Sequence, residues 1–312
     1  MCATNLNIQH SHESTHISPI TMTILGGDTR QLHVACFMAQ AGYDIHAMGL
    51  GDSLPCRIKQ CHNLYHALEG CQALILPLPV TRDKQQINTP LSPTQPISWE
   101  DLKLHLSHMP PIHVFGGCIP DLWCQELKAM GCRVTDYYDS QDIQIKNARI
   151  TAEGAIMTAM ELTDTGILGA SVAVIGYGRI GQYLSRLLTV WGARVTVYAR
   201  RAESLAQASS DGCATHDMTQ LGTLTQGYQV IFNTVPSRLI GHEILSQMPC
   251  QTLLIDLASA PFGIDPEAAR ELTARCGLGV VYAPSVPGRY APKSAGEVIA
   301  QSILSAWPKE GS

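Results

Sequence analysis

The sequence has no hydrophobic run long enough to cross a membrane, no CxxC pair among its cysteines and no excess of positive charge. A membrane span needs roughly 18 consecutive apolar residues, so we expect no membrane partner. The 21 Lys and Arg are outnumbered by 26 Asp and Glu, and the net charge of −5 gives no electrostatic case for a nucleic acid partner. The N-terminus lacks a charged segment followed by an apolar one, so we expect no secretion signal.

The 11 cysteines are an odd number and are scattered along the chain. Without paired spacing, they indicate reduced thiols that act as small apolar side chains, rather than disulfides or a zinc site. We therefore expect a cytoplasmic protein without a metal.

The chain has 312 residues, of which 45% are hydrophobic and 15% charged, and this is enough for two α/β domains. Short β-branched runs alternate with amphipathic stretches that end at glycine, which predicts parallel, doubly wound sheets. We predict an N-terminal α/β domain over residues 20–150, a Rossmann domain over residues 151–292, and helices that join them. A last amphipathic helix, 293–307, is a candidate for packing on the first domain. Residues 1–19 are polar with three histidines, and a disordered tail is favoured over a metal-binding tract.

The strongest signal lies in residues 170–203, where a buried strand, a glycine-rich turn, an amphipathic helix and a second strand follow one another. The spacing of Gly176, Gly178 and Gly181 is the fingerprint of a dinucleotide-binding βαβ unit. Gly176 permits the tight turn, Gly178 lets the backbone approach a pyrophosphate, and Gly181 lets the helix lie close to the strand. The N–H groups at the start of the helix favour phosphates. The residues assigned to the cofactor are Gly176, Tyr177, Gly178, Arg179, Ile180 and Gly181; a buried turn without a ligand is the alternative.

The end of the second strand of this unit decides between the two nicotinamide cofactors. NAD-selective sites place an Asp or Glu there to hold the ribose hydroxyls. This sequence has Ala199, followed by Arg200 and Arg201. Because an arginine pair can clamp a 2′-phosphate, we predict NADP as the cofactor, in contact with these three residues. A solvated basic turn is the alternative.

In the first domain, three turns follow predicted strands: GGDTR (26–30), PLPVT (77–81) and FGGC (115–118). Ligands of doubly wound sheets bind beyond the carboxyl ends of the strands, so these turns should border a cleft. The polar segment 82–100 contains three prolines and leaves directly after PLPVT, and we interpret it as a lid over that cleft.

The GGDTR turn has two interpretations. Its two glycines and the following helix suggest an anion-binding nest, to which Arg30 adds a fixed cation. Equally, Asp28 or Thr29 caps the helix and Arg30 points into water. The spacing does not match the full glycine fingerprint, so we assign no second dinucleotide here.

The later strand ends of the second domain, after residues 232, 257 and 282, should flank the ribose and nicotinamide of the cofactor. One of them, NTVPS, repeats the placement of PLPVT, so the domains look like two versions of one plan that face each other. The cofactor contacts predicted from the first two of these ends are Asn233, Thr234, Val235, Pro236, Leu257 and Ala258.

A helix predicted from Thr151 to about Thr165 joins the domains, with Thr151 as its N-cap. Glu153 then lies in a first turn that faces the cleft, where it is a candidate proton carrier or partner of a substrate amine. Simple compensation of the helix dipole explains Glu153 at least as well.

The sequence resembles the A subunits of dipicolinate synthase, the enzyme with which spore-forming bacteria make pyridine-2,6-dicarboxylate. The resemblance spans residues 20–305, and the segments 1–19 and 82–100 do not carry it. The glycine fingerprint is generic, whereas the first and last of the matching stretches are specific. These stretches are GGDTRQL (26–32), TAEGAIMTAM (151–160), VAVIGYGRIG (172–181), NTVPS (233–237), LIDLAS (254–259) and APSVPGRYAPKSAGEVIA (283–300).

The resemblance implies a two-domain fold like that of the methylenetetrahydrofolate, shikimate and alanine dehydrogenases. It implies an oxidation by NADP⁺ of a small dicarboxylate from the lysine pathway, dihydrodipicolinate or its hydrated precursor. It also implies production in the mother cell during sporulation and, as the partner of the chain, a flavoprotein-like B subunit. We further expect an oligomer.

Such a substrate needs cations or neutral donors opposite its two carboxylates. The candidate cations are Arg30, Arg289 and Lys293, although the last two have surface charge as an alternative interpretation. Ser237 and Ser285 are the candidate neutral donors. No nucleophile–base arrangement can be identified from the sequence, and Glu153 and Asp28 are the only candidates for the proton acceptor.

Two other functions stay open. One is an NADP-dependent dehydrogenase of shikimate or folate type, although Lys59 and Lys84 are poorly placed for the catalytic lysine of a folate enzyme. The other is a non-catalytic, cofactor-binding protein that supports the B subunit.

Overall fold

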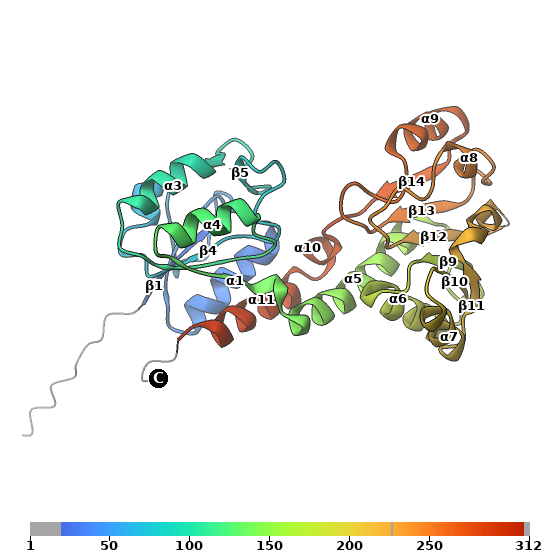
Figure 1. The fold of residues 1–312 in the computed structure, drawn as a ribbon, viewed down its shortest axis with the longest axis horizontal. Helices are drawn as coiled ribbons and strands as arrows, with labels where there is room; N and C mark the ends of the chain where they lie inside the picture. The colour runs from blue at the N-terminus through green and yellow to red at the C-terminus, as the bar shows by residue number, and fades with distance from the viewer. Residues whose placement is uncertain (1–19, 226, 309–312) are drawn as a thin grey trace, which may run out of the picture.

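The computed structural model describes residues 20–225 and 227–308, which form two lobes joined by helices (Figure 1). The tail predicted at residues 1–19 lies outside the described residues. The first lobe consists of β1 (Thr21–Leu25), α1 (Thr29–Gln40), β2 (Asp44–Met48), β3 (Ile58–Gln60), α2 (Leu64–Ala67), β4 (Ala73–Ile75), β5 (Gln86–Ile87), β6 (Ile97–Ser98), α3 (Trp99–Ser107), β7 (His113–Gly116), α4 (Asp121–Ala129), β8 (Arg133–Asp136) and η1 (Tyr137–Asp139).

The long helix α5 (Gln141–Leu162) leads to the second lobe, and the chain ends with two helices that lead back. The elements after α5 are β9 (Ser171–Ile175), α6 (Arg179–Val190), β10 (Arg194–Ala199), α7 (Ala202–Ser210), β11 (Ala214–Asp217), η2 (Met218–Thr225), β12 (Val230–Asn233), α8 (His242–Leu245), β13 (Leu253–Asp256), α9 (Pro266–Cys276), β14 (Gly279–Tyr282), α10 (Val286–Tyr290) and α11 (Pro292–Ala306).

Each lobe is built on a sheet of six parallel strands, and the two sheets have the same strand order. The first sheet has the order β3-β2-β1-β4-β7-β8, and the second has the order β11-β10-β9-β12-β13-β14. In both, the chain starts at the centre, winds to one edge and then crosses over to fill the other edge, which is the Rossmann order. The prediction of two doubly wound α/β domains is confirmed. Ligand crevices are expected beside β1/β4 and β9/β12, where the winding changes direction.

The strands are buried on both faces because their side chains alternate between two layers of helices. In β1, Met22 and Ile24 face the layer that contains α1, whereas Leu25 faces the layer of α2, α3 and α4. In β9, Val172 and Val174 face α5 and α6, and the residues between and after them face α8 and α9. The two sheets thus present their carboxyl ends as the edges where loops can bind a ligand.

Helix α5 begins ten residues earlier than the sequence predicts, and Ser140 occupies its N-cap position. The predicted N-cap, Thr151, is wrong: it is buried in the middle of the helix, and its Oγ1 donates to the carbonyl oxygen of Asn147 at 2.7 Å. The predicted domain boundary at residue 150 therefore falls inside α5. This helix is a continuous rod between the lobes rather than the first element of the second one.

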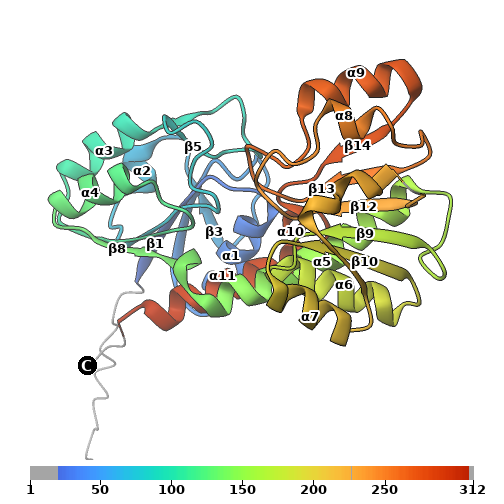
Figure 2. The ribbon, with the colours of Figure 1, turned by 45° about the vertical axis from the view of Figure 1, so that its right-hand side comes forward.

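After β14 the chain returns to the first lobe through α10 and α11. Helix α11 lies beside α1 in both views (Figures 1 and 2). Its Ile299 and Ile303 are buried together with Val34 and Met38 of α1. The last helix of the chain thus completes the core of the first lobe.

The segment interpreted as a lid folds back on the first lobe instead. Strands β5 and β6 form an antiparallel hairpin, and Ile87 and Ile97 are buried in the core of the lobe. The carbonyl oxygen of Asn88 accepts a hydrogen bond of 2.8 Å from the N–H of Gly27, which ties the hairpin to the GGDTR turn. Only Arg82, at the start of the segment, reaches the cleft described below.

Within residues 20–225 and 227–308, no helix is both long and apolar enough to span a bilayer. The same residues contain no cluster of three His, Cys, Asp or Glu side chains that could hold a metal ion. The ten cysteines among them are free thiols.

Candidate active site

A cleft of about 500 Å³ lies between the lobes, at the carboxyl ends of both sheets. Its walls come from the segments after β1, β4 and β7 of the first lobe and after β9, β13 and β14 of the second. A smaller hollow of about 310 Å³ adjoins it along the glycine loop, and Tyr138, Asn147 and Ile180 line both. This is the place that doubly wound sheets give to their ligands.

The glycine loop has the geometry that the fingerprint predicts. Gly176 has a φ of +93°, which disfavours any residue with a side chain. A side chain at Gly181 would collide with the carbonyl oxygen of Gly176. At Gly178, by contrast, no described atom lies within 4 Å of the place where a side chain would begin. The backbone at Gly178 is therefore open to a phosphate.

Helix α6 starts at this open loop. No side chain caps its first turn, so its leading N–H groups are available to a phosphate. Arg179 lines the smaller hollow beside Gly178. Tyr177 has another role: its buried hydroxyl donates to the carboxylate of Asp211, which also accepts from Arg186. Burial and the Asp211 carboxylate raise the pKa of Tyr177, so only its backbone can face the cofactor.

The basic pair that suggests NADP lies at the end of β10. Ala199 is the last residue of the strand and is buried, while Arg200 and Arg201 follow it and are exposed. The neighbouring strand carries an acid, Asp217, in register with Ala199. Hydrogen bonds from the N–H and hydroxyl of Thr219 occupy that carboxylate and lower the pKa of Asp217. The two arginines are thus the charged groups directly after β10.

Asn233 and Asp256 are fully buried and shape the loops after β12 and β13. Nδ2 of Asn233 donates to the carbonyl oxygen of Val235 and to the Asp256 carboxylate, at 3.0 and 2.8 Å. The Asp256 carboxylate also accepts from the N–H groups of Ala258, Gly263 and Ile264. The side chain of Asn233 is therefore engaged by the fold, and contact with a cofactor is left to its neighbours.

Of these neighbouring residues, only some line the cleft or the hollow. Thr234 lines the smaller hollow, and Leu257 lines the cleft. Val235 packs against Gly176 beneath the glycine loop. Pro236 is exposed and Ala258 is buried, and neither lines the cleft.

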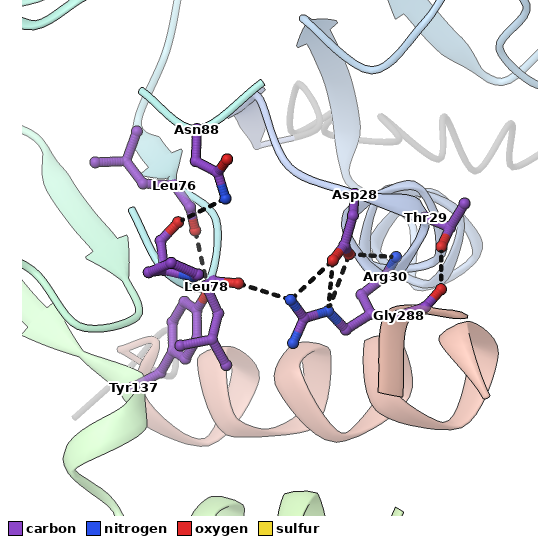
Figure 3. A network of polar contacts seen from close by, with 9 residues as sticks. Asp28, Thr29, Arg30, Leu76, Leu78, Asn88, Tyr137 and Gly288 are labelled. Carbon is purple, nitrogen blue, oxygen red and sulfur yellow. Dashed lines mark hydrogen bonds and ion pairs between the residues drawn. The ribbon is translucent and has the colours of Figure 1, made fainter. Parts of the chain in front are cut away.

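The GGDTR turn holds a partly buried ion pair (Figure 3). Arg30 is 4% exposed, and its Nε and Nη2 donate to the Asp28 carboxylate at 2.8–3.1 Å. Nη2 also donates to the carbonyl oxygen of Leu78 at 2.7 Å, and Asp28 caps α1 through the N–H of Arg30. Both interpretations of the turn therefore hold in part: Asp28 is the cap, and Arg30 is a fixed cation that lines the cleft.

The anion nest predicted for the two glycines of this turn is wrong. The N–H of Gly26 donates to the carbonyl oxygen of Met48, and that of Gly27 donates to Asn88, each at 2.8 Å. Because the protein itself uses both amides, anion binding at this turn falls to the guanidinium of Arg30.

The first and last motifs of the chain meet at this ion pair. A side chain at Gly288 would begin 2.6 Å from Oδ2 of Asp28 and 3.3 Å from Nε of Arg30. The carbonyl oxygen of Gly288 accepts from Oγ1 of Thr29 at 2.6 Å (Figure 3). The glycine lets α10 lie directly on the turn and so joins the returning chain to the floor of the cleft.

Comparisons with known proteins agree with this geometry. Residues 21–138 match the family described as the N-terminal domain of the dipicolinate synthase A subunit. Residues 142–269 match the NAD binding domain of D-isomer specific 2-hydroxyacid dehydrogenases. The A subunit of dipicolinate synthase from Bacillus subtilis (strain 168) is 29% identical over 297 residues, which cover 93% of this chain and 96% of the relative.

Two solved structures extend the match to nearly the whole fold. The dipicolinate synthase A subunit from Bacillus halodurans has a TM-score of 0.79 at 28% identity and covers 93% of this chain and 98% of its own. The corresponding structure from Bacillus subtilis has a TM-score of 0.75 at 29% identity, with coverages of 93% and 97%. Over nearly its whole length, the chain is thus similar to the A subunits of dipicolinate synthase. Its second lobe is a nicotinamide-dinucleotide-binding domain of dehydrogenase type.

Two of the five predicted substrate contacts line the cleft, namely Arg30 and Ser285. Ser237 is exposed outside it. Arg289 is also exposed, and its Nη2 donates to Glu161 of α5 at 2.9 Å. Lys293 lies exposed in the first turn of α11. The structure therefore does not bring Arg289 and Lys293 to the substrate side of the cleft.

The two predicted proton acceptors also lie outside the cleft lining. Asn147 and Thr151, one turn apart on α5, line the cleft. Glu153 follows Thr151 by two residues, about 200° further around the helix, and is exposed. The prediction of a first-turn Glu153 that faces the cleft is wrong because α5 begins at Gln141. Asp28 is engaged by Arg30 and by the helix start.

The cleft is also lined by residues that the sequence does not predict as ligand contacts, among them Arg82, Cys118, Tyr138 and Asn147. Arg82 and Cys118 follow or close turns already expected at strand ends, so their position was a usable signal. Tyr138 and Asn147 lie in η1 and in the first part of α5, where the sequence predicts no helix.

The charges of the site favour an anionic ligand. Arg30, Arg82 and Arg179 line the cleft and the hollow, and no described Asp, Glu or His does so. Burial raises the pKa of Cys118 to about 11, and the carboxylates of Asp136 and Asp139 act in the same direction. Burial likewise raises the pKa of Tyr138. Both groups are therefore neutral donors, and the described lining contains no carboxylate or imidazole base.

Proposed function

We propose that this chain is the A subunit of a dipicolinate synthase. In this proposal it oxidises dihydrodipicolinate, or its hydrated precursor, to pyridine-2,6-dicarboxylate with NADP⁺. The observation that carries the proposal is the cleft with its adjoining hollow: the buried Arg30 lines the cleft, and the open glycine loop lines the hollow. The absence of acidic side chains from its described lining suits a substrate with two carboxylates.

The oxidation removes one hydride and one proton from the dihydropyridine ring, which becomes aromatic. A bound nicotinamide dinucleotide supplies the hydride acceptor. The protein has to hold the ring flat against the cofactor wall and to balance its two negative charges, because aromatisation already favours the product. With no base in the described lining, we propose that the proton passes to water in the open cleft. A hydrated precursor would lose water before or during the oxidation.

Turnover tests the reaction. Purified protein with dihydrodipicolinate and NADP⁺ should produce reduced cofactor, measured by its absorbance, and an equal amount of dipicolinate. Shikimate and a reduced folate, offered in parallel, should produce none. Turnover of either of these, with none of dihydrodipicolinate, would replace the proposal by a different NADP-dependent dehydrogenase.

We also propose that the chain works with a flavoprotein-like B subunit, in an oligomer in the cytoplasm of the mother cell of a spore former. The support is its similarity to these enzyme subunits. The same assay with this chain by itself, with both proteins together, and with only the B subunit tests the division of labour. A gain with both present favours a shared complex. Full turnover with only the B subunit would reduce this chain to a non-catalytic, cofactor-binding protein.

The choice of NADP over NAD is tested at Arg200. Removal of its guanidinium should weaken NADP⁺ binding by about 1–3 kcal/mol, as for a hydrogen bond to a charged group, and change NAD⁺ binding much less. Titration of the Arg200→Ala variant with both cofactors measures this, with the exposed Arg275→Ala of α9 as control. Equal losses for both cofactors would contradict a role at the 2′-phosphate.

A further inference from the structure

We propose that Arg30 and Arg82 form a two-point clamp, in which each guanidinium holds one carboxylate of a planar 2,6-dicarboxylate. The inference rests on the proposed function for the class of ligand. It goes further by naming the side chains that distinguish a dicarboxylate from a monocarboxylate. Both arginines belong to the first lobe, so the clamp holds the ring opposite the cofactor wall of the second lobe.

Arg30 is the rigid half of the clamp. Asp28 and the carbonyl oxygen of Leu78 occupy its Nε and Nη2 and fix the plane of the guanidinium (Figure 3). Its Nη1 makes no hydrogen bond with the described residues, and it is not one of their buried unpartnered atoms. Because Arg30 lines the cleft, Nη1 is the donor that remains for a ligand.

Arg82 is the adjustable half. It follows the turn after β4, lines the same cleft and is exposed, so its long side chain can reach over the bound ring. The nearest acid in the sequence, Asp83, is held in its own turn, where its Oδ1 accepts from Thr81 Oγ1 and from the N–H groups of Gln85 and Gln86. These bonds lower the pKa of Asp83 and fix the turn that carries Arg82.

The charges explain why both arginines are needed. Asp28 already balances most of the charge of Arg30, so this residue offers a directed donor rather than a full positive charge. Arg82 is the other cation in the lining of the cleft, and no acid in that described lining opposes it. Hydrogen bonds between a cation and a carboxylate are stronger than neutral ones. Within the described lining of the cleft, Arg82 is the cation that can give the second carboxylate of a dianion such a bond.

A comparison of two product-like ligands tests the clamp. Dipicolinate carries both carboxylates, and picolinate carries one on the same ring. By calorimetric titration in the presence of NADP⁺, the native protein should bind dipicolinate at least tenfold more tightly than picolinate. The Arg82→Gln variant should lose at least tenfold for dipicolinate and less than twofold for picolinate.

Arg133→Gln is the matched control, because Arg133 is exposed at the start of β8, at the opposite end of the same sheet. It should change neither affinity. Equal weakening of both ligands by Arg82→Gln, or no weakening of either, would overturn the clamp.

The fate of the clamp and that of the proposed reaction can be told apart. If the native protein oxidises dihydrodipicolinate and Arg82→Gln leaves its KM unchanged, the clamp fails and the reaction stands. If the native protein shows no turnover but Arg82→Gln abolishes the preference for dipicolinate, the clamp stands and the reaction fails. A rise in KM larger than the fall in kcat supports both.

Discussion

Gly178 and Gly181 lie three residues apart in one loop, yet a side chain would meet different surroundings at each. The space at Gly178 is open, whereas a side chain at Gly181 would run into the backbone of Gly176. A cofactor site needs the first glycine for its ligand and the second for its fold. Substitutions at the two positions therefore separate binding from stability.

We expect Gly178→Ala to lower cofactor affinity at least tenfold, because the methyl group takes the space of the pyrophosphate. As a change at an N-cap position, it should cost at most about 1 kcal/mol of folding free energy. Gly181→Ala should instead lower the free energy of unfolding by about 2–3 kcal/mol through overpacking. Urea unfolding and cofactor titration of both variants measure the two effects. Native-like cofactor binding by Gly178→Ala would contradict the assigned approach of the phosphates.

His113 is a residue whose titration should affect the whole first lobe. It is 6% exposed, it stacks on Phe115 and Trp307, and its Nε2 pairs with Oγ1 of Thr135 at 2.8 Å. Nδ1 has no partner among the described residues. Burial, helped by the charge of Arg133, lowers the pKa of His113 from its ordinary value of 6.5 to about 4.

This shift predicts a loss of stability in acid. The folded state holds the neutral ring, whereas the unfolded chain takes up a proton below pH 6.5. The stability that the buried ring gives the fold is therefore complete above pH 6.5 and is lost as the pH falls from 6.5 to 4. The loss should reach about 3 kcal/mol. Urea unfolding measures the free energy of unfolding near neutral pH and near the lowered pKa. The difference between these two values should be smaller for His113→Gln than for the native protein. The exposed His108→Gln serves as control and should keep the native difference.

At the scale of the element, the loop after β13 depends on one buried carboxylate. Asp256 collects four donors, three of them backbone N–H groups of residues 258–264. The same loop supplies Leu257, Ser259 and Phe262 to the cleft wall. Asp256 therefore holds this part of the cleft wall in place although it does not line the cleft itself.

Replacement of Asp256 by Asn puts an N–H₂ group where two donors need an acceptor. We expect a loss of about 2–4 kcal/mol in the free energy of unfolding and weaker cofactor binding through a disordered loop. Thermal unfolding and cofactor titration measure both. Asp164→Asn, at an exposed position after α5, is the control. A variant that lost stability but kept full cofactor affinity would show that the loop does not support the site.

The elements that the sequence predicts well have local signals. Strand β1 has such a signal, because its five residues lie between a polar stretch and two glycines. The start of α5 is not predicted, since its first ten residues are mostly polar and only contacts with the first lobe show which face is buried. The pairing of Arg289 with Glu161 joins residues 128 positions apart, and no local sequence pattern indicates a contact between such distant residues. The sequence therefore places the cofactor loop and Arg30, whereas the other two predicted substrate cations, Arg289 and Lys293, lie outside the cleft lining.

At the scale of the molecule, the chain crosses between the lobes twice, through α5 and through α10 and α11 (Figure 2). The second crossing makes the first lobe depend on residues that follow the second lobe. Ile299, Ala300 and Ile303 of α11 are buried in the core of the first lobe with Met22, Val34 and Met38. The last helix of the chain thus ties the two lobes together, and the cleft lies between them.

This arrangement predicts which lobe each substitution weakens. Ile303→Ala, near the end of the chain, should lower the stability of the first lobe by about 2–5 kcal/mol, as for other buried large-to-small changes. Leu272→Ala in α9 should weaken the second lobe instead, because Leu272 packs on the second sheet. Calorimetric unfolding with and without NADP⁺ distinguishes them, since a ligand raises the transition of the lobe that binds it. The cofactor should raise the temperature of the unfolding transition that Leu272→Ala lowers. It should not change the temperature of the transition that Ile303→Ala lowers. If Ile303→Ala lowered only the cofactor-sensitive transition, α11 would belong energetically to the second lobe, against its observed packing on α1.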